Sequence, residues 1–182
     1  MNHDYSMLLS EQFGMLLPEE VILLKRTIRN VTKDSPVIID IGTGTGITTI
    51  ASLEEKPLVR ITSIDHVLSA ALGRVVEAGL PVDRVEFLTC DSTEASDVWE
   101  GDIDVVILDG DHTPSKVDLD LRAWCKALVI GGVLIVHDYG AEIPMWADKK
   151  AVVDRYARYN GLQFVERAGC LAVFTKGGRG RK

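Results

Sequence analysis

The sequence predicts an α/β fold: a doubly wound, seven-stranded sheet that is mostly parallel, with an antiparallel last strand. Short β-branched runs alternate with segments of helical periodicity, as expected for a parallel sheet covered by helices on both faces. Two more such runs close the chain after the last helical segment, and a glycine-rich loop follows the first run. No repeat or linker divides the 182 residues, so a single domain is expected.

Each expected strand is a short apolar run. The first five, expected to be parallel and buried on both faces, are 37–41, 59–64, 85–88, 103–108 and 133–136. The closing pair is 162–166 and 170–175. Because parallel strands need crossover connections, the segments between the first five should hold helices.

Helices are expected at 18–31, 67–76 and 149–159, and the segment after the glycine loop could form another. A further helix should begin at Thr113-Pro114, with Thr as N-cap and Pro at the first helical position. Its apolar face would run from Val117 to Leu128, and Gly131-Gly132 would close it before the next strand.

Composition limits the function classes. The net charge of −7 and pI near 5.1 argue against general nucleic-acid binding, which needs a basic surface. Three cysteines without CxxC spacing indicate neither a disulfide framework nor a zinc knuckle. We find no signal-peptide pattern and no membrane-spanning run, so a cytoplasmic protein is expected. One domain should occupy 1–176, with a helical segment at 1–34, a core at 35–176 and a disordered tail at 177–182.

A carboxylate stands at the carboxyl end of every expected parallel strand, at Asp40, Asp65, Asp91, Asp109 and Asp138. Ligands of doubly wound sheets bind outside this edge. Aspartate often caps helices and fills turns, so one or two such residues would carry no meaning. A carboxylate at each of these strand ends favours a ligand with amine, hydroxyl or cationic groups, or a divalent metal.

The loop after the first strand reads D-x-G-x-G-x-G, with glycines at 42, 44 and 46. It departs from the dinucleotide fingerprint G-x-G-x-x-G in the spacing of the third glycine. It also lacks the lysine of a phosphate-binding Walker loop. The pattern fits instead the loop that holds the methionine end of S-adenosylmethionine.

From about 35 to 176 the sequence resembles class I S-adenosylmethionine-dependent methyltransferases. It is most similar to the small O-methyltransferase group that includes macrocin O-methyltransferases and cephalosporin-hydroxylase-like proteins. The segments that carry the resemblance are IDIGTGTGITT, ITSIDH, FLTCDS, VVILDGDHTPSKVDLDLRAW and LVIGGVLIVHDYG. The resemblance implies a Rossmann-like sheet with a reversed seventh strand.

The resemblance also implies a cofactor site. Asp40 would meet the amino-acid end of S-adenosylmethionine, directly or through water, Asp65 would accept both ribose hydroxyls, and Asp91 would lie near the adenine amino group. The full expected set is Asp40, Gly42, Thr43, Gly44, Asp65, His66, Asp91, Ser92 and Asp109.

For catalysis, the resemblance to macrocin-type enzymes implies His112 as the general base, with Asp109 beside it, in O-methylation of a small hydroxylated acceptor. The helix N-terminus favours neutral His112 and adjacent Asp111 favours the charged form, so the sequence leaves the net direction open. His112 could instead only cap the loop, and a non-catalytic cofactor-binding module remains the alternative from another class.

Asp109, His137 and Asp138 form a candidate metal group, since relatives of the catechol and macrocin types carry magnesium at corresponding strand ends. Imidazole suits Mn, Fe or Zn better than Mg, so His137 could instead be a second base or part of a hydrogen-bond network. Tyr139, Met145 and Trp146 are candidates for lining the acceptor pocket, with an aromatic packed under the loop as the alternative, and 15–17 could close over the cofactor. A neighbouring subunit of a homo-oligomer could contribute as well.

Overall fold

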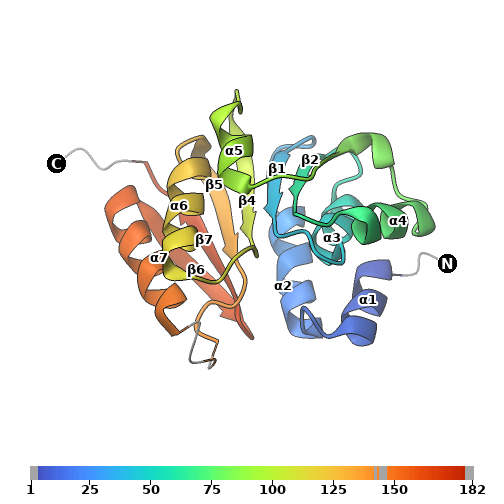
Figure 1. The fold of residues 1–182 in the computed structure, drawn as a ribbon, viewed down its shortest axis with the longest axis horizontal. Helices are drawn as coiled ribbons and strands as arrows, with labels where there is room; N and C mark the ends of the chain where they lie inside the picture. Colours follow the sequence, from blue (N-terminus) through green and yellow to red (C-terminus); the bar gives the residue numbers. More distant parts are fainter. Residues whose placement is uncertain (1–3, 142, 144–146, 179–182) are drawn as a thin grey trace.

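The computed structural model describes residues 4–141, 143 and 147–178 and contains one seven-stranded sheet with the order β3-β2-β1-β4-β5-β7-β6 (Figure 1). The strands are β1 (Val37–Ile41), β2 (Arg60–Ile64), β3 (Val85–Leu88), β4 (Ile103–Leu108), β5 (Leu128–Val136), β6 (Leu162–Ala168) and β7 (Leu171–Lys176). The helices are α1 (Tyr5–Phe13), α2 (Pro18–Arg29), α3 (Ile47–Glu55), α4 (Ser69–Glu77), α5 (Ser92–Asp97), α6 (Pro114–Trp124) and α7 (Ala147–Asn160), with a 3₁₀ turn η1 (Val82–Arg84).

The strand directions confirm the predicted fold class. β1 to β5 pair in parallel, and β7 is antiparallel to both β5 and β6. β6 therefore runs in the same direction as the first five strands, and β7 alone is reversed. The result is the Rossmann-like, doubly wound α/β sheet that the alternating sequence pattern predicts.

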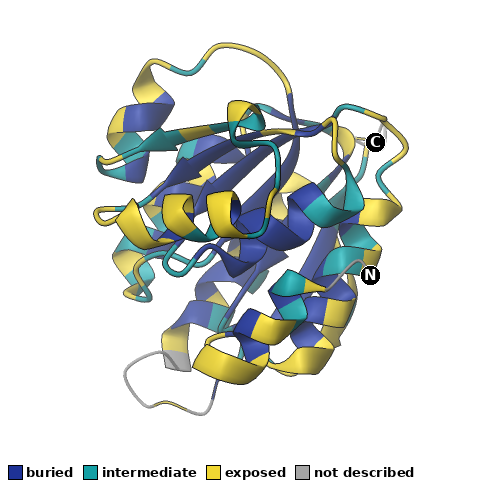
Figure 2. Ribbon diagram, turned by 90° about the vertical axis from the view of Figure 1, so that its right-hand side faces the viewer, coloured by how far each residue is buried: buried dark blue, intermediate teal, exposed yellow. Residues whose placement is uncertain are grey.

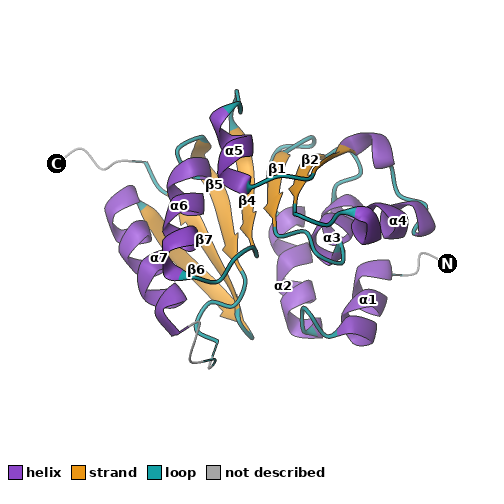
Figure 3. Cartoon of the chain, viewed as in Figure 1, coloured by secondary structure: helices purple, strands orange, loops and turns teal. Residues whose placement is uncertain are grey.

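Helices cover both faces of the sheet. Figure 3 shows α1 to α4 on one side of the strands and α5 to α7 on the other. Alternate side chains of β1 enter different cores: Ile38 packs with Leu24 and Ile50 on the α2–α3 face, whereas Ile39 lies in the core that contains the α6 residues. The buried sheet residues are the dark blue layer in Figure 2, between helices with exposed outer faces.

One boundary prediction was wrong. α6 ends at Trp124, and Leu128 opens β5 instead of closing the helix. Gly131-Gly132 lies within β5, where the pairing with β4 shifts register between Ile103 and Val105. Gly131 has φ 82°, which a strand interrupted by a bulge can use but which ends regular pairing. Glycine thus marks an irregular strand here, and not a helix end.

Two helices were not predicted individually. α1 carries its own signals, because the Asp4 side chain accepts a hydrogen bond from Met7 N and Gly14 ends the helix with φ 63°. α5 is only six residues long and follows its N-cap Asp91. The single domain at 1–176 stays a prediction, and 179–182 of the expected tail lie outside the described residues. Within the described part of the chain, no helix combines the length and apolarity needed to cross a bilayer.

Candidate functional site

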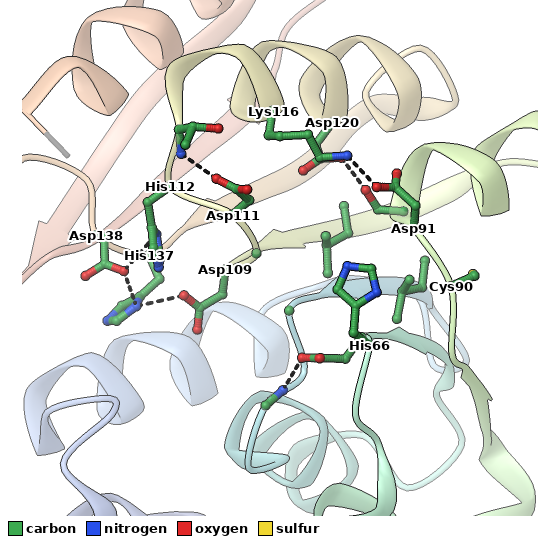
Figure 4. A pocket seen from close by; sticks show the side chains of 18 of the residues that line it. His66, Cys90, Asp91, Asp109, Asp111, His112, Lys116, Asp120, His137 and Asp138 are labelled. Carbon is green, nitrogen blue, oxygen red and sulfur yellow. Dashed lines mark hydrogen bonds and ion pairs between the residues drawn. The ribbon is translucent and has the colours of Figure 1, made fainter. Parts of the chain in front are cut away.

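The carboxyl ends of the parallel strands open into a cavity of about 930 Å³ (Figure 4). Of the predicted site residues, the structure brings to its wall Gly42, Gly44, Asp65, His66, Asp91, Ser92, Asp109, His112, His137 and Asp138. Met15, from the segment before α2, also lines it. In Figure 4 the group Asp109–His137–Asp138 occupies one end of the cavity, and His66 and Asp91 occupy the other.

The glycine loop packs directly against the end of β4. Gly42 N donates to Ile64 O at 2.9 Å, and Asp109 N donates to Ile41 O at 2.8 Å. A Cβ on Gly42 would lie 2.2 Å from the carbonyl oxygen of Asp109, and its φ is 81°. Both the backbone angle and the close approach therefore require glycine at this position.

Asp40 lies behind this loop and does not line the cavity. The residue is fully buried, and its Oδ2 accepts hydrogen bonds from Thr49 Oγ1 at 2.6 Å and Thr48 Oγ1 at 2.9 Å. Its Oδ1 has no partner among the described residues. Thr43 is also buried, outside the cavity wall, and donates to Asp40 O at 3.2 Å. In this arrangement both residues hold the loop from behind and make no direct contact with the cavity.

Burial raises the pKa of Asp40 from 3.8 to about 6, against the opposing hydrogen bonds from the two threonines. The folded chain thus binds this proton more tightly than the unfolded chain. The resulting stability is complete below pH 3.8 and is lost as the pH rises to 6, by about 1.4 kcal/mol per unit and about 3 kcal/mol in all. In urea unfolding at several pH values, the free energy of unfolding of wild type minus that of Asp40→Asn should fall by about 2 kcal/mol between pH 4 and 6.5. Parallel profiles for the two proteins would contradict the prediction.

Asp65 connects the end of β2 to the glycine loop. Its Oδ2 accepts Gly44 N at 2.8 Å, and its Oδ1 accepts Val67 N at 3.1 Å. An ionised carboxylate offers about four lone-pair positions, so each oxygen of this cavity-lining group can still accept another hydrogen bond. His66, the next residue, lines the same part of the wall.

Asp91 is held by two groups at the opposite wall. It caps α5 by accepting Thr93 N at 2.9 Å, and Lys116 Nζ lies 2.6 Å from its Oδ2. The Lys116 hydrogen bond keeps the pKa of Asp91 well below its usual range. Ser92 Oγ donates to buried Asp120. Lys116 and Asp120 were not predicted, although their spacing of four residues after a strand-end loop places them on one helical face.

His112 lies in the loop between β4 and α6. Its Nδ1 is 3.2 Å from Lys149 Nζ and 3.4 Å from Asp138 Oδ2. Burial lowers the pKa of His112, and the positive charge of Lys149 lowers it further, outweighing the nearby carboxylates. The structure thus settles the direction that the sequence leaves open, and the imidazole is neutral near pH 7.

Lys149 was not predicted as a site residue. It lies in the first turn of α7 and is fully buried, and burial lowers its pKa against the pull of surrounding aspartates, Asp109 first. Nothing local marks it, because the helical pattern of 149–159 is equally consistent with an exposed lysine. Its burial follows from the packing of α7 on α6.

His137 is surrounded by carboxylates. Its Nδ1 lies 2.9 Å from Asp109 Oδ1 and 3.3 Å from Asp138 Oδ2, and its Nε2 lies 3.2 Å from Glu20 Oε2. Burial alone would lower the pKa of His137, but the bonds to Asp109, Asp138 and Glu20 raise it to about 12. With both nitrogens donating, the ring is not placed to accept a proton from a substrate. Nothing local in the sequence marks Glu20, because acidic residues in the first turn of a helix are common.

The predicted metal group does come together: one ligand atom each from Asp109, His137 and Asp138 lie within 4.8 Å of one another. Among the described residues, Asp138 is the only non-glycine residue with a positive φ, which is 53°. A left-handed backbone at a site residue costs energy and is retained where the surrounding structure over-determines it. Two carboxylates and an imidazole are a donor set that fits Mn²⁺ or Zn²⁺ better than Mg²⁺.

Tyr139 packs away from the cavity. It is 5% exposed, stacks with Phe164 at 6.3 Å between ring centroids, and donates to Asp154 Oδ1 at 2.5 Å. It belongs to the core between the sheet and α7, and the alternative of an aromatic packed under the loop holds for it. Met145 and Trp146 lie outside the described residues.

Comparison with known proteins agrees with this fold. A proposed rRNA methylase from Clostridium thermocellum has a TM-score of 0.73 and 16% identity, over 91% of this chain and 99% of that chain. A proposed caffeoyl-CoA O-methyltransferase from Staphylococcus aureus has a TM-score of 0.76 and 15% identity, over 94% and 92%. The SAH-bound Podospora anserina methyltransferase PaMTH1 has a TM-score of 0.73 and 12% identity, over 97% and 89%. At these identities the similarity establishes the fold.

The sequence comparisons match only part of the chain. A search of curated proteins finds no match. A family model described as a methyltransferase domain matches residues 39–139, from the middle of β1 to just after β5. The matched segment contains the glycine loop, Asp65, Asp91 and the His112 loop. Because it makes up more than half of the 182 residues, this chain belongs to the methyltransferase domain family.

Proposed function

We propose that this chain binds S-adenosylmethionine in the strand-end cavity and transfers its methyl group to the hydroxyl of a small acceptor, with His112 as the proton acceptor. The observation that carries the proposal is that one cavity is lined both by the glycine loop with Asp65 and by His112 with Asp109. Cofactor and acceptor would thus meet at the same strand edge. When bound, the cofactor supplies a methyl group activated by its sulfonium.

The residues present fit this cofactor. Gly42 leaves no room for a side chain, so backbone forms the cavity wall beside β4. The lone pairs that remain on Asp65 suit a pair of ribose hydroxyls. PaMTH1, one of the similar structures, is SAH-bound, which supports the same ligand class. Asp40 acts in this scheme through the loop that it holds.

His112 is the group best suited to take the acceptor's proton. Methyl transfer needs an aligned nucleophile and, for a hydroxyl, removal of its proton. The neutral imidazole lines the cavity, and for this role its Nδ1 would donate to Asp138 Oδ2, 3.4 Å away, which leaves Nε2 to accept the proton. Asp109 lies beside it at the end of β4, hydrogen-bonded to His137.

A small acceptor is favoured over RNA, although two of the similar structures are described as rRNA methylases. The cavity wall at the His112 end carries the carboxylates of Asp109, Asp111 and Asp138, and the chain carries a net charge of −7. Carboxylates repel the phosphates that dominate nucleic-acid affinity. A filter-binding titration with ribosomal RNA at low salt is expected to show no saturable binding.

An activity assay separates an enzyme from a non-catalytic cofactor-binding module. S-adenosylhomocysteine formation is measured with a panel of catechols, sugars and other hydroxylated acceptors. Turnover with a hydroxylated compound supports O-methylation, and turnover only with amines or RNA contradicts it. Cofactor binding without turnover on any acceptor would favour the module.

Asp65→Ala is expected to weaken binding of S-adenosylhomocysteine by about 10²–10⁴-fold. Each charge-assisted hydrogen bond is worth about 1.5–3 kcal/mol, and two ribose bonds would be lost. Calorimetry measures the dissociation constant, and Asp83→Ala is the control because that side chain is 80% exposed and outside the cavity. Unchanged affinity in Asp65→Ala would remove Asp65 from the site, and tighter binding of NAD by the wild type would reject this cofactor class.

A further inference from the structure

Glu20 is a buried carboxylate at the start of α2 and is only 2% exposed. Its Oε1 accepts the backbone N–H of Cys170, in the β6–β7 turn, at 2.6 Å. Its Oε2 accepts the backbone N–H of Leu17 at 2.7 Å. A Cβ at residue 169 would lie 2.5 Å from Oε1, so glycine there makes room for this carboxylate. Two distant backbone segments therefore fix Glu20 in one orientation.

The same Oε2 points at the ring of His137, with Nε2 at 3.2 Å. Both oxygens of Glu20 already accept backbone N–H groups, so the carboxylate acts as an acceptor toward the ring as well. Nε2 of His137 must then carry a hydrogen. The contact thus fixes the orientation of the ring and leaves Nδ1 facing Asp109 and Asp138.

The other ring nitrogen faces two carboxylates from different strand ends. Nδ1 lies 2.9 Å from Asp109 Oδ1 and 3.3 Å from Asp138 Oδ2. Bonds of about 2.0–2.2 Å to one ion separate neighbouring ligand atoms by about 3–3.5 Å. The two separations from Nδ1 are close to that spacing, and the three ligand atoms all lie within 4.8 Å of one another.

We propose that Glu20 is a positioning residue for a metal site: it holds His137 with hydrogen on Nε2, so that Nδ1 joins Asp109 and Asp138 as ligands of a divalent transition ion such as Mn²⁺ or Zn²⁺. A carboxylate on the far nitrogen of a ligating histidine orients the ring and strengthens it as a ligand. The ion takes the place of hydrogen on Nδ1, since only the neutral ring ligates. The inference concerns the same site as the proposed function but is independent of the acceptor.

The donor set also sets the preference among ions. Magnesium prefers six oxygen ligands in near-ideal octahedral geometry, and imidazole nitrogen suits Mn²⁺ and Zn²⁺ better. The site is therefore expected to bind Mn²⁺ and Zn²⁺ more tightly than Mg²⁺. The preference for Mn²⁺ and Zn²⁺ over Mg²⁺ follows from the nitrogen of His137. The affinity for these ions depends on how Glu20 holds the ring.

The test measures ion binding by the full, untagged chain after removal of metals with EDTA, with no cofactor present. Mn²⁺ binding is followed by electron paramagnetic resonance and Zn²⁺ binding by calorimetry. Glu20→Gln should weaken both by about 10–100-fold, the usual effect of losing such a partner. The amide keeps the size of the side chain but turns an NH₂ toward one of the groups that now donate to it. Glu19→Gln, at the exposed neighbour on the same helix, should match the wild type.

A second variant keeps the proposal testable if Glu20→Gln does not fold. His137→Asn replaces the imidazole nitrogen with an amide oxygen, so the preference for Zn²⁺ over Mg²⁺ should fall by about tenfold or more. Absence of Mn²⁺ and Zn²⁺ binding in the wild type would overturn the metal site, and so would Mg²⁺ binding as tightly as either ion. Wild-type affinity in folded Glu20→Gln would overturn the role of Glu20. Cofactor affinity measured in parallel shows separately whether the proposed function holds.

Discussion

His112→Ala is expected to lower kcat for the true acceptor by about 10²–10⁴-fold, the usual contribution of a general base. The reason is positional and electrostatic. His112 lines the cavity between the end of β4 and α6, and burial together with Lys149 lowers its pKa, so the ring is neutral and able to take a proton. The cofactor's amino-acid and ribose ends would be held elsewhere, by the glycine loop and Asp65. Affinity for S-adenosylhomocysteine should therefore stay close to that of the wild type.

The measurement combines single-turnover methyl transfer with calorimetry on the same protein. His112→Gln is a useful second variant, because its amide keeps polar contacts in the loop but cannot accept the proton as a base. Loss of turnover in both variants with unchanged cofactor affinity supports the role of His112. Full turnover in either variant would make His112 structural. His137 would not take its place, since both of its nitrogens already donate to carboxylates.

Gly42→Ala is expected to destabilise the fold and abolish cofactor binding together. Its Cβ would lie 2.2 Å from Asp109 O and 2.5 Å from Gly110 N, both backbone atoms that cannot move independently of β4. The left-handed backbone adds about 1–2 kcal/mol, and overpacking typically adds about 1–3 kcal/mol. The sum of about 2–5 kcal/mol lowers the melting temperature by roughly 10 °C in a domain of this size.

Gly79→Ala is the matched control for this prediction. Gly79 also has a positive φ, 67°, but a Cβ there would meet nothing within 4 Å. It should therefore show only the backbone cost of about 1–2 kcal/mol, with unchanged affinity for S-adenosylhomocysteine. The difference between the two variants, measured by thermal unfolding and calorimetry, isolates the clash between the glycine loop and β4. Equal destabilisation with retained cofactor binding in Gly42→Ala would show that the loop does not need this close approach.

Local patterns were enough to predict the strand edge and its carboxylates. β-branched runs and helical periodicity identify parallel strands, and parallel strands bring their carboxyl ends to one edge. Asp65, Asp91, Asp109 and His112 could therefore be placed together from the chain alone. The same local reasoning failed at Gly131-Gly132, because glycine permits both a helix end and a bulged strand, and only pairing with β4 decides between them.

The tertiary structure alone decided which groups from distant parts of the sequence contact the strand-edge residues. Glu20 lies 117 residues from His137, and Lys149 lies 37 from His112, so no spacing in the sequence links either pair. The packing of α2 beside the β6–β7 turn and of α7 on α6 brings them together. Burial then sets their charge states. The fold also places Asp40 behind the glycine loop, outside the cavity where it was expected to meet the amino-acid end of the cofactor. The sequence thus determined the strand edge and its carboxylates, because strand direction and chain order are local properties. The partners, burial and protonation of those carboxylates depend on contacts between distant segments and exist only in the folded chain.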